Sequence, residues 1–138
     1  MIKKDSQIKL KDSLEKLVLA QKSLEEAVAL PVENDRDLAG IIQSFEFVYE
    51  LAWKTLKRLL EALGHETSAA RDVFKMAYKI DLLSEEKVWL DILEDRNKTF
   101  HTYSRKMAEE LVAKVKSRYV AAFRELVKSI HEKVVPLV

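Results

Sequence analysis

The sequence predicts an all-α protein, specifically an antiparallel four-helix bundle with an additional short helix. Only two glycines and two prolines occur in 138 residues, and this scarcity of helix breakers favours long helices. Hydrophobic residues make up 48% of the chain, as is typical of globular proteins. Apolar residues recur every three or four positions over long stretches, which is the spacing of one helix face, and no strand-like alternation is visible.

The first two helices are expected to be long. The first covers about residues 5–30 and is ended by Pro31, because proline cannot continue a helix. Asn34 or Asp35 can cap the second helix, and Gly64 lies where a left-handed residue ends it. The apolar stripe of this second helix is the clearest periodic signal in the sequence and consists of Leu38, Ile41, Ile42, Phe45, Tyr49, Ala52, Trp53, Leu56, Leu59, Leu60 and Leu63.

Three further helices complete the predicted bundle. A short third helix is expected over about residues 68–83. Ser84 is expected to cap the fourth, with Glu85 and Glu86 at the positive end of its dipole. The fifth helix begins after Ser104 and runs almost to the end of the sequence.

Composition and charge exclude several classes of function. No repeat or flexible linker interrupts residues 1–138, so one helical-bundle domain is expected. The net charge of +1 gives no overall attraction to nucleic acid or to an anionic membrane. The absence of cysteine excludes disulfides, Cys-ligated zinc and thiol chemistry. Neither a secretory signal nor an apolar run of about 20 residues is visible, so we expect a cytoplasmic protein with no membrane contact.

The apolar stripe of the fourth helix leads directly onto an arginine, Arg96. The stripe consists of Val88, Trp89, Ile92 and Leu93. Because burial of an unpaired guanidinium is strongly unfavourable, Arg96 should pair with an anion, lie at a subunit interface or line a cleft. Glu94, Asp95 or a carboxylate of another subunit can supply that anion. Glu46 and Glu50, which flank the stripe of the second helix, are further candidates.

His101 follows Arg96 after five residues, which places the two side chains about 140° apart on an ideal helix. The two side chains therefore diverge on a straight helix. They converge if the helix ends near Phe100, or if residues from two copies of the chain meet across a dimer axis. This geometry favours a site formed in a homodimer.

Arginine and histidine together suit the cleavage of a phosphodiester. The imidazole of His101 can accept or donate a proton, and the guanidinium of Arg96 can stabilise charge on phosphate oxygens. RNA supplies its own nucleophile, the 2′-hydroxyl, so no metal is required. Asn97 can orient the phosphate or the imidazole, and Tyr103 can bind substrate or accept a modification. The spacing of Arg96 and His101 alone also occurs in many helical proteins without such a site.

A family resemblance adds specificity to this motif. The string RNKTFHTY at residues 96–103 resembles the R-x-x-x-x-H-x-Y motif of the HEPN superfamily. The segments SFEFVYELAWKTLK at 44–57 and WLDILEDRN at 89–97 resemble the nucleotidyltransferase substrate-binding proteins, a HEPN branch. The resemblance spans essentially the whole chain. It implies a helical bundle that dimerises, and a partner that is a minimal nucleotidyltransferase.

The resemblance implies two alternative roles. In one, the protein is the toxin of a toxin-antitoxin pair, a metal-independent endoribonuclease that uses no cofactor. Arg96 and His101 then carry cleavage with help from Asn97, and the partner adenylylates Tyr103. In the other, the protein is a non-catalytic subunit that binds substrate for the nucleotidyltransferase. The sequence leaves both roles open.

The fifth helix carries an excess of basic residues. Between residues 104 and 133, eight residues are basic and four are acidic. The basic residues are Arg105, Lys106, Lys114, Lys116, Arg118, Arg124, Lys128 and Lys133, and the acidic ones are Glu109, Glu110, Glu125 and Glu132. This excess can help to hold an RNA backbone, and an ordinary solvated helix face explains it equally well.

Overall fold

A series of helices accounts for nearly all of the residues that the computed structural model describes, 4–99 and 104–134. In chain order they are α1 (Lys4–Ala29), α2 (Asp35–Ala62), α3 (Ala70–Lys79), α4 (Glu86–Lys98), α5 (Arg105–Lys114), the π-helical turn η1 (Val115–Tyr119) and α6 (Val120–Val134). The described residues contain no strand, so the all-α prediction is confirmed. Within the same residues, no helix is long and apolar enough to cross a bilayer.

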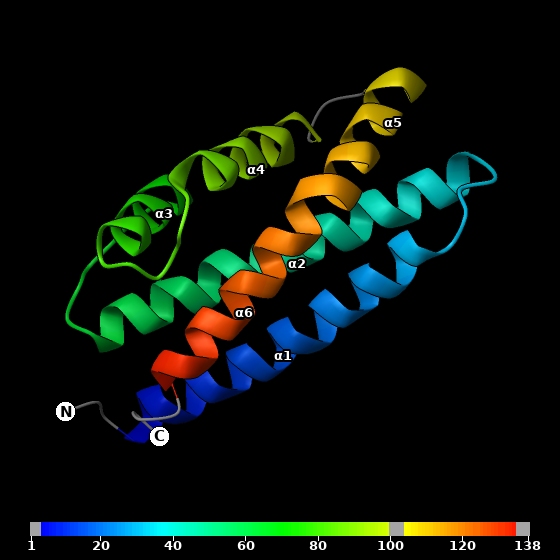
Figure 1. Cartoon of the computed structure of the whole chain (residues 1–138). Helices are drawn as coiled ribbons and strands as arrows, with labels where there is room; N and C mark the ends of the chain where they lie inside the picture. Colours follow the sequence, from blue (N-terminus) through cyan, green and yellow to red (C-terminus); the bar gives the residue numbers. More distant parts are fainter. Residues whose placement is uncertain (1–3, 100–103, 135–138) are drawn as a thin grey trace.

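Figure 1 shows how the helices pack. α1 and α2 form an antiparallel pair, and α5, η1 and α6 form one long helix that packs against both. α4 runs antiparallel to that long helix and contacts it at η1, while α3 joins α4 to α2. The four helices of the predicted bundle are therefore α1, α2, α4 and the α5–α6 helix, and α3 is the additional short one.

Three helix ends follow their predicted signals. The Asn34 side chain caps α2, because its Oδ1 accepts a hydrogen bond from the Asp37 backbone N–H at 3.0 Å. Gly64 has a φ of 91°, the left-handed conformation predicted just after this helix. The Ser104 hydroxyl caps α5 by accepting from the Met107 N–H at 3.2 Å.

The third helix covers only Ala70–Lys79, so it is shorter than the predicted range of 68–83. The residue that ends it is Asp81, whose φ of 65° is left-handed. The next N–H, that of Leu82, then bonds back to the Ala77 carbonyl at 2.8 Å. This pattern closes a helix and is usually built around glycine, so no signal in the sequence predicted it.

The predicted cap of the fourth helix at Ser84 is wrong by one residue. The N-cap is Glu85, which makes no capping side-chain hydrogen bond, and Glu86 is the first helical residue. Leu82 and Leu83 are both buried. The segment between α3 and α4 therefore packs against the core, and α4 begins only after the chain leaves that contact.

Aromatic side chains from several elements form the centre of the core. The rings of Phe45 and Tyr119 stack with centroids 5.7 Å apart, and those of Phe74 and Trp89 lie 5.2 Å apart. Trp89 also meets Phe123 edge-on at 5.6 Å. These contacts join α2, α3, α4, η1 and α6, so packing against α3 and α6 sets the position of α4.

Candidate functional site

The last turn of α4 contains two adjacent buried charges, Asp95 and Arg96. Asp95 is 7% exposed and Arg96 is 9% exposed, and no other charged residue in 4–99 and 104–134 is as buried. The helix ends at Lys98 and is followed by Thr99 as its C-cap. The prediction that Arg96 occupies a covered position is therefore confirmed.

Carboxylates of α2 pair with the Arg96 guanidinium. Its Nη1 lies 3.3 Å from Oε2 of Glu46, and its Nη2 lies 3.8 Å from Oε1 of Glu50. These two glutamates are four residues apart and so share one face of α2. Their side chains are only partly exposed, 31% and 38%. The structure thus selects Glu46 and Glu50 among the predicted candidates, since Glu94 pairs with Lys98 instead.

Thr99 connects the end of α4 to this ion pair. Its hydroxyl accepts a hydrogen bond from Arg96 Nη1 at 3.1 Å. The same hydroxyl lies 2.7 Å from the Arg96 carbonyl and 3.1 Å from Oε2 of Glu46, either of which can accept its proton. The C-cap residue therefore helps to hold the guanidinium in place.

Tyr49 lies beside the guanidinium. The Arg96 Cζ is 6.0 Å from the centroid of the Tyr49 ring, within the range of a cation–π contact. Burial, and then the neighbouring Glu50 carboxylate, raise the pKa of Tyr49 to about 12, although Arg96 acts in the opposite direction. The phenol therefore stays neutral at physiological pH.

Asp95 makes its contacts on the long C-terminal helix. Its carboxylate accepts a hydrogen bond from the Tyr119 hydroxyl, and its Oδ2 lies 3.3 Å from Nζ of Lys114. Tyr119 is fully buried. Burial and the hydrogen bond to Asp95 raise the pKa of Tyr119 well above its ordinary value. The sequence candidate Asp95 therefore contacts Lys114 and Tyr119, whereas Glu46 and Glu50 are the carboxylates that pair with Arg96.

Of the other predicted site residues, the structure describes Asn97. Asn97 is exposed. His101 and Tyr103 lie outside the described residues. The end of α4 at Lys98 meets one of the two conditions given for convergence of Arg96 and His101, an end of the helix near Phe100.

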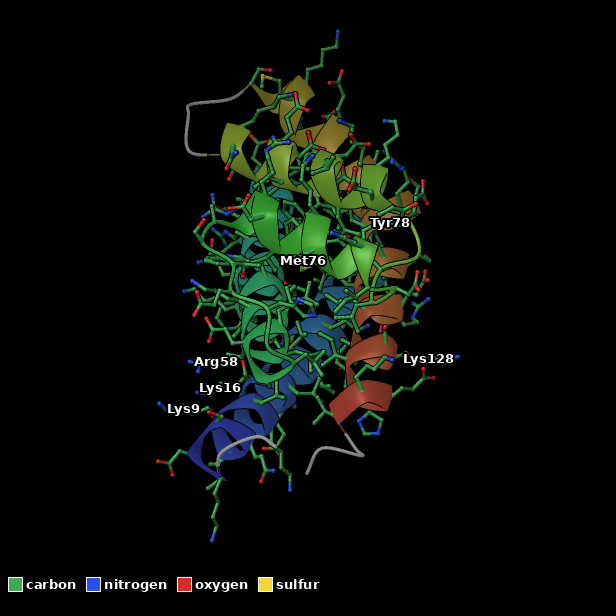
Figure 2. All side chains as sticks on the ribbon, turned by 90° about the vertical axis from the view of Figure 1, so that its left-hand side faces the viewer. Lys9, Lys16, Arg58, Met76, Tyr78 and Lys128 are labelled. Carbon is green, nitrogen blue, oxygen red and sulfur yellow. The ribbon has the colours of Figure 1, made fainter. Side chains whose placement is uncertain are left out.

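Half of the basic residues of the C-terminal helix pair with other segments of the chain. The four ion pairs are Arg105 with Asp35, Lys114 with Asp95, Arg118 with Asp91 and Arg124 with Glu25. Figure 2 shows the exposed Lys128 on the opposite side of the view from Lys9, Lys16 and Arg58. These observations favour the interpretation of this helix as an ordinary solvated face rather than an RNA-binding surface.

Two contact residues of Arg96 were not predicted as part of the site. Thr99 lies three residues after Arg96, one helical turn away, and Tyr49 lies between Glu46 and Glu50 on α2. Helical spacing alone was the available signal for both. No group of three or more His, Asp or Glu side chains suited to holding a metal ion occurs among residues 4–99 and 104–134.

The fold and the site define a class of protein: an all-α bundle in which a short helix ends on a buried arginine held by carboxylates of a neighbouring helix. Comparison with known proteins identifies the family. Residues 12–132 match the family described as "Nucleotidyltransferase substrate binding protein like", and the chain belongs to it.

A bacterial protein is similar in sequence to part of this chain. The chain is 34% identical over 89 residues to a Haemophilus influenzae protein named "Probable ribonuclease HepT". That match spans 61% of each of the two chains, so more than a third of the relative is not covered.

Two solved structures share the fold. One is HI0074 of Haemophilus influenzae, described as revealing the fold of a substrate binding domain of a nucleotidyltransferase, with a TM-score of 0.75 and 28% identity. The other, from Thermus thermophilus, has a TM-score of 0.71 and 25% identity. Each comparison covers 86% of this chain and 98% of the solved one.

Proposed function

We propose that this protein is a HEPN-type toxin, a homodimeric, metal-independent endoribonuclease controlled by a cognate minimal nucleotidyltransferase. The observation that carries the proposal is the burial of Arg96, the first residue of the R-x-x-x-x-H-x-Y motif, against the carboxylates of Glu46 and Glu50. The similarity to a relative named as a probable ribonuclease supports the same reaction class.

The proposed reaction uses the 2′-hydroxyl of RNA as nucleophile. His101 accepts the proton of that hydroxyl while its oxygen forms a bond to the adjacent phosphorus. The bond from phosphorus to the 5′-oxygen of the next nucleotide breaks, and a proton delivered by a second imidazole or by water completes the 5′-hydroxyl. Arg96 stabilises the charge that develops on the phosphoryl oxygens, and Asn97 orients the phosphate.

The site is proposed to form between two copies of the chain. Phe47 is 60% exposed on α2, next to Glu46, and Gly40 lies about two turns earlier on the same exposed face. A Cβ at Gly40 would meet nothing within 4 Å, although glycine in a helix costs about 1 kcal/mol relative to alanine. Close approach of a second α2 explains both residues.

The dimer is tested with Phe47→Glu, measured by light scattering after size exclusion. We expect the wild type to be a dimer and the variant a monomer, because two introduced carboxylates would face each other across the interface. Leu19→Glu, at an exposed apolar position of α1, is the matched control and should stay dimeric. A monomeric wild type, or a dimeric Phe47→Glu variant, would contradict this interface.

The catalytic proposal is tested by RNA cleavage in the presence of a chelator. Arg96→Ala and His101→Ala should each lower the cleavage rate by about 100-fold or more, because each removes a charge-stabilising or proton-transferring group. His131→Ala, which removes a histidine in the last turn of α6, is the matched control and should retain activity. Absence of cleavage by the wild type, or equal cleavage by all variants, would refute the ribonuclease proposal.

Control by the partner is proposed to act on Tyr103. The Tyr103 oxygen loses its proton and bonds to the α-phosphorus of ATP, and pyrophosphate leaves. The AMP transferred in this way places a bulky anion two residues from His101, which repels and occludes the RNA phosphate. Coexpression with the cognate nucleotidyltransferase, followed by mass spectrometry, should locate one AMP on Tyr103. AMP on another residue, or none when the transferase is active, would reject this mechanism.

A second candidate function is a non-catalytic subunit that binds substrate for a nucleotidyltransferase. The family description and the description of HI0074 favour it. If this protein copurifies with the transferase and raises its activity, while neither RNA cleavage nor growth inhibition is observed, the subunit function is supported over the toxin.

A further inference from the structure

Two consecutive residues in the last turn of α4 contact different neighbouring helices. Arg96 is held by Glu46 and Glu50 of α2, and Asp95 is held by Lys114 and Tyr119 of the C-terminal helix. Adjacent residues on a helix point about 100° apart. One attachment would allow the turn to rotate about the contact, whereas two attachments in different directions fix its rotation.

The π-helical turn η1 makes the attachment of Asp95 possible. Lys114 and Tyr119 are five residues apart, so on an α-helix their side chains would point about 140° away from each other. In η1 the hydrogen bond of the Val120 N–H runs to the carbonyl of Val115, five residues earlier, so residues five apart lie about one turn apart. Both side chains therefore reach one carboxylate.

Packing alone does not fix the gap between the end of α4 and α5. A cavity of about 80 Å³ lies there, lined partly by Lys98, Thr99, Met107 and Leu111. Asp95 and Lys114 also line this cavity and span it with their ion pair. The distance of the last turn of α4 from the C-terminal helix thus depends on polar contacts, which are directional, rather than on close-packed apolar side chains.

A purely structural purpose does not explain a buried carboxylate at this place. Removal of a charge from water is costly, and apolar residues of similar volume often stabilise a protein as well or better. Apolar packing of Trp89, Ile92 and Leu93 positions the preceding turns of α4, whereas the buried residues of its last turn are Asp95 and Arg96, so polar contacts set the rotation of that turn. The side chain whose direction depends most on that rotation is Arg96, the next residue along the helix.

We propose that Asp95 and Tyr119 are positioning residues for Arg96: their hydrogen bond fixes the rotation of the last turn of α4 and thereby the direction of the guanidinium. The proposal deepens the proposed ribonuclease function, on which its kinetic test rests. Neither residue touches the RNA. Lys114, whose side chain is half exposed, supports the same carboxylate from the solvent side.

The variant that tests the proposal most directly is Tyr119→Phe, which removes one hydroxyl and keeps the ring stacked on Phe45. We expect kcat for RNA cleavage to fall by about tenfold or more while KM changes less than about threefold, because misplacement of a catalytic group lowers the rate of the chemical step. Arg124→Gln is the matched control. It breaks the ion pair of Arg124 with Glu25 of α1, which joins the same long C-terminal helix to another helix at a solvent-exposed position, and should leave kcat unchanged.

A second measurement is independent of activity. The Nε–H of Arg96 gives an NMR signal whose exchange with water reports how firmly the guanidinium is held. In Tyr119→Phe this exchange should accelerate about tenfold. The slow backbone amides of α1 and α2, which report global unfolding, should accelerate less. Asp95→Asn, which keeps the shape of the side chain but not its charge, should act in the same direction.

The outcomes separate this proposal from the proposed function. If the wild type cleaves no RNA, the ribonuclease function fails, and the exchange of the Arg96 Nε–H still decides whether Asp95 and Tyr119 position it. Equal acceleration at Arg96 and at the α1 and α2 amides would show a merely structural role and overturn the positioning proposal. So would an unchanged Arg96 signal in Tyr119→Phe, or an equal effect of Arg124→Gln.

Discussion

The two sides of the last turn of α4 differ in burial. On the C-terminal-helix side, the Asp95 carboxylate faces one cation, Lys114, and the hydroxyl of the fully buried Tyr119. On the α2 side, the Arg96 guanidinium faces two carboxylates, 31% and 38% exposed, at 3.3 and 3.8 Å. Glu50 also lies 3.7 Å from Nζ of Lys54, so both sides are balanced in charge, and they differ in how far water reaches the charged groups.

Because of this difference, the Asp95 side holds the last turn of α4 in place, whereas the Arg96 side can take part in chemistry. A balanced, buried contact has little tendency to exchange partners, because any new partner would have to displace a desolvated one. A guanidinium shared by two partly hydrated carboxylates can exchange one of them for a phosphate, since water stabilises the released carboxylate. The Asp95 side therefore acts as the fixed side of the turn, and the Arg96 side as the one that can change.

The largest expected effect on stability comes from the fixed side. Asp95→Ala should lower the free energy of unfolding by about 3 kcal/mol, because it leaves the hydroxyl of Tyr119 buried without its acceptor. Arg96→Ala should cost less, about 1–2 kcal/mol, because water reaches Glu46 and Glu50. Urea unfolding of both variants measures the difference. A larger loss for Arg96→Ala would reverse the comparison.

Alkaline pH is expected to weaken both sides through their tyrosines. The pKa of Tyr49 is raised to about 12 and that of Tyr119 is also raised, so folding favours the neutral phenol in each case. This contribution is complete below the unfolded pKa of about 10 and is lost as pH rises towards the folded pKa. Each tyrosine should remove about 1.4 kcal/mol of stability per pH unit above about pH 10.

Single variants distinguish the two sides in this pH range. Tyr49→Phe removes the tyrosine next to Arg96, and Tyr119→Phe removes the one bound to Asp95. Each should reduce the slope of unfolding free energy against pH by about half between about pH 10 and 11.5. An unchanged slope in Tyr49→Phe or Tyr119→Phe would show that the tyrosine on that side does not couple folding to pH.

Much of the fold was predictable because its signals are local. Apolar periodicity located the long helices, and the caps at Asn34 and Ser104 and the stop at Gly64 depend only on neighbouring residues. The left-handed Asp81 and the late start of α4 after Ser84 were not predictable in this way. Both depend on how the connection between α3 and α4 packs against the core.

The site was predictable on one side only. Arg96 interrupts an apolar stripe, and Glu46 and Glu50 lie four residues apart beside another, so ordinary helical spacing placed the two glutamates among the candidate partners. The partners of Asp95 are Lys114 and Tyr119, five residues apart, a spacing that places side chains on different faces of an α-helix. The π-helical turn that brings them together leaves no periodic signal in the sequence.

The smallest expected effect on stability belongs to Glu50→Gln, on the Arg96 side of the last turn of α4. The substitution should alter the free energy of unfolding by less than about 0.5 kcal/mol, because the contact of Glu50 with Arg96 is long and partly hydrated. It removes one of the two negative charges that compete with phosphate for Arg96, so KM for RNA should fall by about threefold. Glu94→Gln is the matched control, since it removes the same charge from an exposed position on α4 that faces Lys98. If KM is unchanged, or if both variants lower it equally, Glu50 does not compete with the phosphate and the α2 side is as fixed as the Asp95 side.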